Sequence, residues 1–266
     1  MDAKMKRKIL VAFDFDKTFV DADSSEMIIQ LTQFKSIPGI LKRLLSSEGW
    51  EKRRVLFSLL HVFGITPNDI LNHLSTIQLV PGIRDLLYGL PREDTEIIIV
   101  SDGYSLAIDV VLKKEGLQDV ISKVFTNHTE FDKEGHLIIH PYHQQNWCYL
   151  SKRNMCKGDI LTSYIKSREE QNVVFPTIAY VGDGNNDFCP SIRLRERDLV
   201  FPRRGYSLYN ILVRYEQKGF HLDAEVHPWD SGTDILEKLL PHYQTLNSNQ
   251  VLPVPRIENS DASKDN

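Results

Sequence analysis

Short apolar runs recur along the chain and are separated by stretches in which apolar residues have helical spacing. The runs contain Ile, Leu, Val, Ala and Phe without polar alternation, which is typical of strands buried on both faces of a parallel sheet. The expected strands are residues 9–13, 97–100, 177–181 and 199–201, with a further short strand at 123–126. Strands alternating with helices predict an α/β fold built on a parallel sheet.

The segment after the first strand has the spacing of several consecutive helices. Asp23 is the expected N-cap of the first helix, which ends before Pro38; Gly64 closes the second helix, and Thr66 begins the third. A strand–helix–strand crossover needs only one helix, so the others form an insertion. We therefore expect residues 24–78 to be a helical cap that covers the site as a lid.

The rest of the chain returns to the strand and helix pattern up to the C-terminal tail. Residues 247–266 are rich in Asn, Ser, Asp and Pro and are expected to be disordered. The sequence thus predicts a catalytic core made of residues 1–23 and 79–246, the cap between these two parts, and a disordered tail.

The composition is that of an ordinary globular protein, with 41% hydrophobic and 26% charged residues among 266. A net charge of −4 and a pI of about 6.1 provide no basic field for nucleic acid. The three cysteines are an odd number, which favours reduced thiols, and no apolar stretch reaches the ~20 residues of a membrane helix. With no secretory signal either, we expect a cytoplasmic protein without a membrane or nucleic-acid partner.

Acidic residues follow the first strand directly, at Asp14 and Asp16. Ligands of open α/β sheets bind beyond the carboxyl ends of the strands, and two such close carboxylates need a cation or a proton between them. A divalent metal ion would neutralise Asp14 and leave an oxygen free to attack an electrophile, while Asp16 could deliver a proton to a leaving group. Thr18 offers a hydroxyl and a backbone N–H to an anion. The alternative is an acidic helix N-cap after a strand.

Polar clusters also follow two later strands. Ser101 and Asp102 follow one of them, and the glycine-rich segment 182–187 brings Asp183 and Asp187 after another. Three strands that each end in such a cluster indicate one site along an edge of the sheet. Together with Asp14, the later carboxylates make an oxygen-only cation site suited to Mg²⁺. The alternative for residues 182–187 is an ordinary surface loop.

Phosphoryl groups need hydrogen-bond donors and positive charge. Ser101 is a donor. Lys157 lies just before a helix expected over residues 160–165 and is a point charge for the phosphate and the attacking carboxylate. These residues predict a site that holds a phosphoryl group beside a magnesium ion and an attacking carboxylate. A non-catalytic phospho-acceptor, such as a receiver-like signalling module, and an inactive phosphate-binding module use similar residues and stay open as alternatives.

The chain resembles phosphatases of the haloacid dehalogenase (HAD) superfamily in four ordered motifs: Asp14-Phe15-Asp16-Lys17-Thr18, Ser101, Lys157 and Gly182-Asp183-Gly184-Asn185-Asn186-Asp187. The resemblance implies a Rossmann-like core with a three-layer parallel sheet, and it identifies the helical insertion with the small cap of that superfamily. It also implies transient phosphorylation of Asp14 and acid–base catalysis by Asp16. We therefore expect a magnesium-dependent phosphatase that hydrolyses a small phosphomonoester through an aspartyl-phosphate. Magnesium is then expected on Asp14, the backbone carbonyl of Asp16 and Asp183, with Asp187 in support.

A narrower resemblance extends from about Lys8 to Leu240. The chain is similar to the phosphoethanolamine/phosphocholine phosphatases and their pyridoxal phosphate phosphatase relatives in the segments Phe13-Asp14-Phe15-Asp16, Val100-Ser101-Asp102, Met155-Cys156-Lys157, 182–190 and 201–206. The resemblance implies that Asp102 contacts the substrate. It places a second substrate-contacting acid at position 25, where this chain has Ser25. Asp21 and Asp23 lie nearby, so we expect an acidic pocket that favours a cationic head group such as an amine.

Several features stay open at the level of sequence. Arg203 and Arg204 either bind an anion near the site or face solvent. Residues 136–156 carry histidines and cysteines, but their spacing fits no compact zinc pattern, so a polar loop is the expectation. The sequence fixes neither the substrate nor the oligomeric state.

Overall fold

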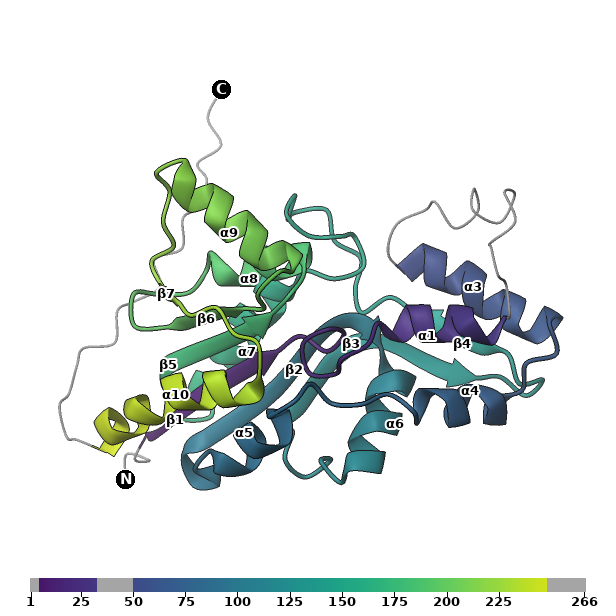
Figure 1. Cartoon of the computed structure of the whole chain (residues 1–266), viewed down its shortest axis with the longest axis horizontal. Coiled ribbons are helices and arrows are strands. Elements are labelled where there is room, and N and C mark those ends of the chain that lie inside the picture. The colour runs from purple at the N-terminus through teal and green to yellow at the C-terminus, as the bar shows by residue number, and fades with distance from the viewer. Residues whose placement is uncertain (1–4, 33–49, 248–266) are drawn as a thin grey trace.

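Residues 5–32 and 50–247 of the chain are described by a computed structural model. The strands are β1 (Lys6–Phe13), β2 (Thr95–Tyr104), β3 (Lys123–Phe131), β4 (Leu137–His140), β5 (Val173–Gly182), β6 (Leu199–Pro202) and β7 (Glu225–Val226). They form one seven-stranded sheet in the order β4-β3-β2-β1-β5-β6-β7 (Figure 1). Neighbouring strands are parallel except β3 and β4, which are antiparallel. The predicted parallel sheet is therefore confirmed, with one antiparallel edge strand in addition.

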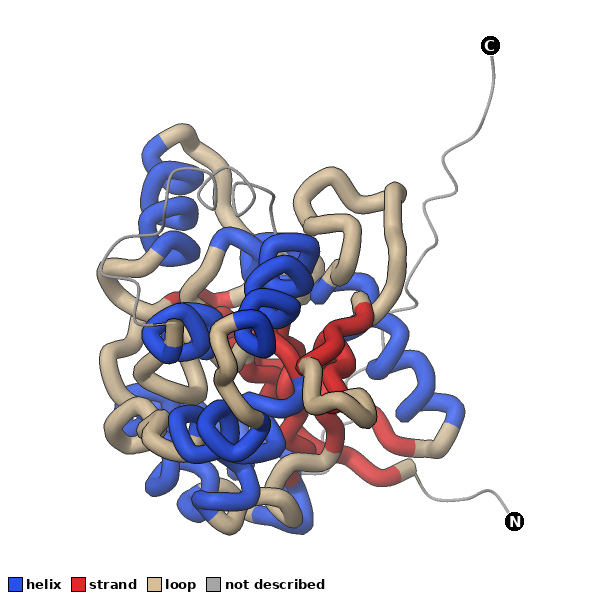
Figure 2. Tube along the Cα trace, turned by 90° about the vertical axis from the view of Figure 1, so that its right-hand side faces the viewer, coloured by secondary structure: helices blue, strands red, loops and turns tan. Residues whose placement is uncertain are grey.

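The sheet is the middle of three layers because its central strand is apolar on both faces. Ile9, Val11 and Phe13 of β1 belong to one buried cluster, and Leu10 and Ala12 belong to another. On the first face lie the helices α5 (Ile83–Gly89), α6 (Ser105–Glu115) and α10 (Gly232–Asn247); on the second lie α7 (Lys157–Glu170) and α9 (Ser207–Gln217). Figure 2 shows the strands enclosed by helices on both sides. This arrangement confirms the Rossmann-like three-layer core.

The inserted segment contributes three described helices, α1 (Ser24–Leu31), α3 (Trp50–Val62) and α4 (Pro67–Leu74). They lie together beside β4, beyond one end of the long central strands (Figure 1). Asp23 caps α1 and Thr66 caps α4, as the sequence predicts. The expected helix end at Pro38 and the predicted disorder beyond residue 247 lie outside the described residues. The division into core and cap stays a prediction.

Two elements have different bounds from those that the sequence predicts. β2 continues beyond Val100 to Tyr104, because Tyr104 pairs with Asn127 of β3. The helix expected from Ile160 already begins at Lys157, so this lysine is the first residue of α7. The four-residue helix α8 (Phe188–Ser191) and the two-residue strand β7 were not expected, because elements so short leave no periodic pattern. None of the described helices combines the length and apolar character needed to cross a membrane.

Candidate functional site

The polar ends of three adjacent strands meet at one edge of the sheet. Phe13 of β1 is in register with Ile99 of β2 and with Val181 of β5, so the residues that follow these positions are neighbours. The backbone N–H of Asp14 donates to the carbonyl of Val181 at 2.9 Å, which fixes the first acid beside the loop that follows β5. The sheet thereby brings the predicted clusters together, as expected for parallel strands.

The centre of the site is a buried cluster of three carboxylates and one ammonium group. Ligand oxygens of Asp14, Asp183 and Asp187 lie within 4.8 Å of one another. The Lys157 Nζ is 2.7 Å from Asp14 Oδ2 and 2.8 Å from Asp187 Oδ1. The exposed fraction of each of these four residues is 8% or less. Three negative charges therefore face one positive charge in a region that is largely shielded from water.

Crowding and burial change the proton affinities of this cluster. Burial raises the pKa of Asp14 well above its usual value, and Asp187 raises it further, while Lys157 acts in the opposite direction. Burial and Asp187 likewise raise the pKa of Asp183 to about 7. For Lys157, burial opposes the positive charge, but Asp14 and Asp187 outweigh it and raise the pKa. The cluster thus has an excess of negative charge that a proton or a metal cation would neutralise.

Asp187 holds the loop after β5 and has no free oxygen. Its Oδ1 accepts hydrogen bonds from Lys157 and, at 2.6 Å, from the hydroxyl of Tyr180. Its Oδ2 accepts the backbone N–H groups of Asp183 at 3.1 Å and Gly184 at 2.8 Å. A Cβ at Gly182 would lie 2.6 Å from the Asp187 carboxyl carbon, so only glycine fits there. This geometry agrees with the supporting role predicted for Asp187 and adds Tyr180, which the sequence presents as an ordinary strand residue.

Asp16 is oriented by the first residue of the inserted segment. Its two carboxylate oxygens accept hydrogen bonds from the backbone N–H and the hydroxyl of Ser24, both at 3.0 Å. Burial raises the pKa of Asp16 to about 6, with a further contribution from Asp23. A carboxyl group with this pKa exchanges its proton near neutral pH, as an acid–base catalyst must. Ser24 is a site residue that the sequence pattern did not reveal.

The hydroxyls predicted to bind an anion have different surroundings. Thr18 is buried and its hydroxyl donates to Asp183 Oδ1 at 3.1 Å, so it positions a carboxylate. Ser101 is also buried, and its Oγ accepts the N–H of Gly103 at 3.0 Å. A Cβ built on Gly103 would be 3.0 Å from Ser101 Oγ and 3.6 Å from Asp16 Oδ2, which puts Ser101 on the Asp16 side of the site. Ser101 donates no hydrogen bond to another described residue, so its hydroxyl can donate to a ligand.

Asp102 is surrounded by donors from three parts of the chain. Lys152 Nζ lies 3.2 Å from one carboxylate oxygen, and Asn154 donates to the other at 2.5 Å. The guanidinium of Arg53, on α3, donates to the Asp102 carbonyl at 2.6 Å and lies 3.7 Å from its carboxylate. Arg53 also donates to Ser25 Oγ at 2.9 Å. Burial alone would raise the pKa of Asp102, but these cations and Asn154 lower it, so the group is ionised and paired.

The other two acids of the expected pocket also have cationic partners. Arg203 Nη2 lies 2.8 Å from Asp21, and its Nη1 donates to the carbonyl of Lys17 at 2.6 Å. Lys17 Nζ lies 3.3 Å from Asp23. Arg203 therefore holds the loop after β1, which answers one question that the sequence left open, whereas Arg204 is exposed and pairs with an aspartate at the surface. The carboxylates expected to make the pocket acidic are thus compensated by the chain itself.

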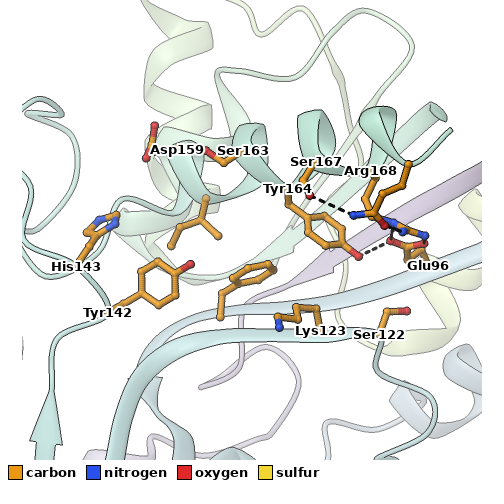
Figure 3. A pocket seen from close by; sticks show the side chains of 13 residues that line it. Glu96, Ser122, Lys123, Tyr142, His143, Asp159, Ser163, Tyr164, Ser167 and Arg168 are labelled. Carbon is orange, nitrogen blue, oxygen red and sulfur yellow. Dashed lines mark hydrogen bonds and ion pairs between the residues drawn. The ribbon is translucent and has the colours of Figure 1, made fainter. Parts of the chain in front are cut away.

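A cavity lies away from these residues, between α7 and the strands β2 and β3. Its volume is about 680 Å³, and its lining contains none of the predicted site residues. Figure 3 shows that Glu96, Tyr164 and Arg168 point toward one another at one end of it. Arg168 Nε lies 2.7 Å from Glu96, and Tyr164 also donates to this carboxylate. Because these polar groups satisfy each other, we place the chemistry at the aspartate cluster.

Comparisons of sequence identify related phosphatases. The family described as Putative Phosphatase matches residues 9–243. The chain is 34% identical to the pyridoxal phosphate phosphatase PHOSPHO2 of Bos taurus, over 87% of this chain and 97% of that protein. It is 33% identical to the phosphoethanolamine/phosphocholine phosphatase of Gallus gallus, over 87% of this chain and 88% of that protein. The narrower resemblance inferred from the motifs is therefore confirmed.

Solved structures share the fold at low sequence identity. A substrate-bound phosphoserine phosphatase complex matches 90% of this chain and 99% of its own with a TM-score of 0.55 and 15% identity. A phospho-aspartyl intermediate analogue of phosphoserine phosphatase matches 88% of this chain and 99% of its own, also with a TM-score of 0.55 and at 17% identity. These similarities confirm the HAD-like α/β architecture.

Proposed function

The chain belongs to the Putative Phosphatase family of HAD-type phosphatases, and on this premise we propose that it hydrolyses a small phosphomonoester through a phosphorylated Asp14 with the help of Mg²⁺. The observation that supports the proposal best is the buried ion pair between Asp14 and Lys157, beside two further carboxylates. A carboxylate held by an ammonium group at a sheet edge is oriented for attack on an incoming phosphoryl group.

The donor set of the cluster fits a hard divalent cation. All candidate ligands are oxygens. The negative charge of the three carboxylates exceeds the positive charge of the single lysine. Mg²⁺ is commonly held by one or two carboxylates together with substrate phosphate. Asp14, Asp183 and the backbone carbonyl of Asp16 would hold it, with Asp187 behind them, since both Asp187 oxygens are engaged. When bound, the ion would neutralise charge between the carboxylates and the phosphoryl group.

In the first step, a carboxylate oxygen of Asp14 attacks phosphorus and the ester P–O bond breaks. Asp16, in its protonated form, gives its proton to the departing oxygen, so the alcohol leaves neutral. Lys157 and the hydroxyl of Ser101 donate to phosphoryl oxygens whose charge increases during transfer. The pKa of about 6 for Asp16 supports this role because the group is partly protonated near neutral pH, unlike an ordinary carboxyl group.

In the second step, Asp16 is ionised and accepts a proton from a water molecule. The water oxygen attacks phosphorus, the bond between phosphorus and Asp14 breaks, and inorganic phosphate is released. Ser24 keeps the Asp16 carboxylate in one orientation through both steps, since it donates to both oxygens. An acid–base group positioned in this way distinguishes a phosphatase from a phospho-acceptor that only carries the phosphoryl group.

The substrate proposal follows from the residues around Asp102. The relatives are named for pyridoxal phosphate and for phosphoethanolamine or phosphocholine. In this chain Arg53 and Lys152 already neutralise Asp102, and Arg53 contacts Ser25, at the position where the resemblance places an acid. Surroundings with this excess of donors favour a substrate whose distal group accepts hydrogen bonds over one with a cationic amine. We therefore propose that pyridoxal phosphate is preferred to phosphocholine.

A panel of phosphate esters tests this function. We expect release of inorganic phosphate from pyridoxal phosphate and para-nitrophenyl phosphate. EDTA should abolish this activity, and added Mg²⁺ should restore it. The Asp14→Asn variant is the matched control, because it keeps the side-chain volume and removes the nucleophile. Stoichiometric phosphorylation without turnover would support a phospho-acceptor instead, and phosphate binding without either reaction would support an inactive binding module.

A further inference from the structure

Three cysteine sulfurs meet at a point separate from the aspartate cluster. Cys148 lies in the loop before α7, Cys156 directly precedes α7, and Cys189 lies in α8. The three Sγ atoms are all within 4.8 Å of one another. Cys189 Sγ is 3.5 Å from that of Cys148 and 3.8 Å from that of Cys156. The molecule thus carries a second group of potential metal ligands, all of them sulfur.

We propose that Cys148, Cys156 and Cys189 bind one zinc ion as a structural site. Tetrahedral zinc with Zn–S bonds of about 2.3 Å places its sulfur ligands about 3.8 Å apart, close to the two distances above. A disulfide would need an S–S distance of about 2.05 Å, so no two of these cysteines are bonded to each other. Sulfur ligands select zinc and other soft ions, whereas Mg²⁺ prefers the carboxylates.

The surroundings supply a fourth position and a counter-charge. Ser151 Oγ lies 3.4 Å from Cys148 Sγ, where this hydroxyl or a water molecule can complete a tetrahedron. Three thiolates and one Zn²⁺ have a net charge of −1, and Arg193 Nη2 lies 3.9 Å from Cys156 Sγ.

The position of the cluster indicates what the ion would do. Cys156 is adjacent to Lys157, and Cys189 lies two residues beyond Asp187, the partner of that lysine. Gly158 allows the close approach, because a Cβ there would lie 2.7 Å from Cys189 Sγ. A zinc ion would thus fasten the loop before α7 to the two segments that hold the Lys157–Asp187 pair. The site does not depend on the proposed reaction.

The sequence did not predict this site because Cys189 is distant from the other two cysteines along the chain. The nearby histidines have other partners and do not complete the set of ligands. His136 pairs with Asp132, and His140 lies 3.2 Å from Glu130. His143 accepts the backbone N–H of Cys156 at 2.9 Å, so it supports the loop.

Metal binding by the purified chain tests the proposal directly. The protein is kept reduced, stripped of metal, and titrated with ZnCl₂, or with CoCl₂ to read thiolate-to-cobalt charge-transfer absorption. We expect about one zinc per chain by elemental analysis, with the absorption typical of sulfur ligation. The Cys148→Ser variant, changed at the partly exposed ligand, should bind zinc at least ~100-fold more weakly, since loss even of outer partners costs 10–100-fold.

Two further variants identify the site and keep the test decisive. Asp183→Asn, in the carboxylate cluster, should retain zinc, whereas Ser151→Cys should bind it more tightly through a fourth thiolate. Zinc that is lost in Asp183→Asn but kept in Cys148→Ser would overturn the proposal. The proposal would also be overturned if the reduced protein gave no sulfur-to-cobalt absorption, or if Ser151→Cys left the affinity for zinc unchanged. A Cys148–Cys189 disulfide in protein isolated without reductant, together with no zinc uptake after reduction, would indicate a redox pair instead.

Discussion

At the scale of single residues, the site depends on charges that the chain does not fully balance. Three buried carboxylates face one ammonium group, and burial raises the proton affinity of Asp14 and Asp183. Such an arrangement costs folding free energy unless a cation or a proton is bound. The same imbalance makes the cluster able to bind a divalent cation and a phosphoryl group. Stability and function therefore oppose each other at these residues.

The residues that we propose to react could be identified as candidates from the sequence, but their hydrogen-bond partners could not. Asp14, Asp16 and Asp183 follow strands, and strand ends are visible in the apolar pattern. Tyr180 and Arg53 lie inside a strand and a helix, where their residue types are ordinary. Only the three-dimensional contacts show that Tyr180 donates to Asp187 and that Arg53 reaches Asp102.

Replacing the acid–base residue should slow both chemical steps. We expect Asp16→Asn to lower kcat by about 10²–10⁴-fold for substrates with a poor leaving group, because the proton donor and acceptor is lost. Ser24→Ala is the matched variant: it removes one of two hydrogen bonds to the same carboxylate and should cost much less. Steady-state kinetics with an alkyl phosphate measure both. An unchanged rate in Asp16→Asn would exclude this residue as the acid.

The head-group preference should depend on Arg53. Charged hydrogen bonds contribute about 1.5–3 kcal/mol, so Arg53→Ala should lower kcat/KM for pyridoxal phosphate about tenfold or more. The value for phosphocholine should fall less or rise, because Asp102 loses one of its cations. Arg54→Ala makes the same chemical change at an exposed neighbour on α3 and serves as the control. An equal decrease in kcat/KM for both substrates would show that Arg53 does not discriminate between their head groups.

At the scale of elements, the sequence predicts the strands and helices that are longer than about one helical turn. The buried strands and the caps of α1 and α4 follow from apolar runs and capping residues. The sequence predicts that β2 ends at Val100, because the residues that follow are polar. In the structure the strand continues, since Asn127 donates to the carbonyls of Asp102 and Gly103 inside the protein. A sequence pattern cannot show that a distant side chain satisfies such groups.

The N-cap of α4 gives a stability prediction for the inserted helices. Thr66 and Asp69 form a reciprocal capping box. We expect Thr66→Ala to lower the free energy of unfolding by about 1 kcal/mol, since it removes the acceptor for the Asp69 N–H. Ser75→Ala, which removes a hydroxyl at the other end of the same helix, should have a smaller effect. Urea unfolding of both variants measures the difference, and equal effects would contradict the capping contribution.

At the scale of the whole molecule, the linkage between metal, protons and folding can be measured. Asp183 has a pKa of about 7 in the folded chain, against 3.8 for an unperturbed carboxyl. Between these values the folded state binds an extra proton, so the free energy of unfolding falls as the pH rises through this window. Bound Mg²⁺ would offset that loss, by about 2.7 kcal/mol at a concentration ~100 times its Kd.

We therefore expect Mg²⁺ to raise Tm more above pH 7 than near pH 5, where protons compete for the carboxylates. Calorimetry at the two pH values with and without the ion measures the shifts. In Asp183→Asn both the shift and its pH dependence should shrink, because a ligand and a titrating group are lost together. A shift of the same size at both pH values would contradict the assignment of the metal to this cluster.

The measurement that tests the account most directly is chemical trapping of the phosphorylated enzyme. The chain is mixed with pyridoxal phosphate and Mg²⁺, quenched within one turnover, reduced with borohydride and digested for mass spectrometry. Borohydride converts an aspartyl-phosphate to homoserine, and we predict this conversion at Asp14 alone, increased in Asp16→Asn and absent without substrate. Turnover without homoserine at position 14 at any quench time would contradict the proposed mechanism, and so would homoserine in place of a different aspartate.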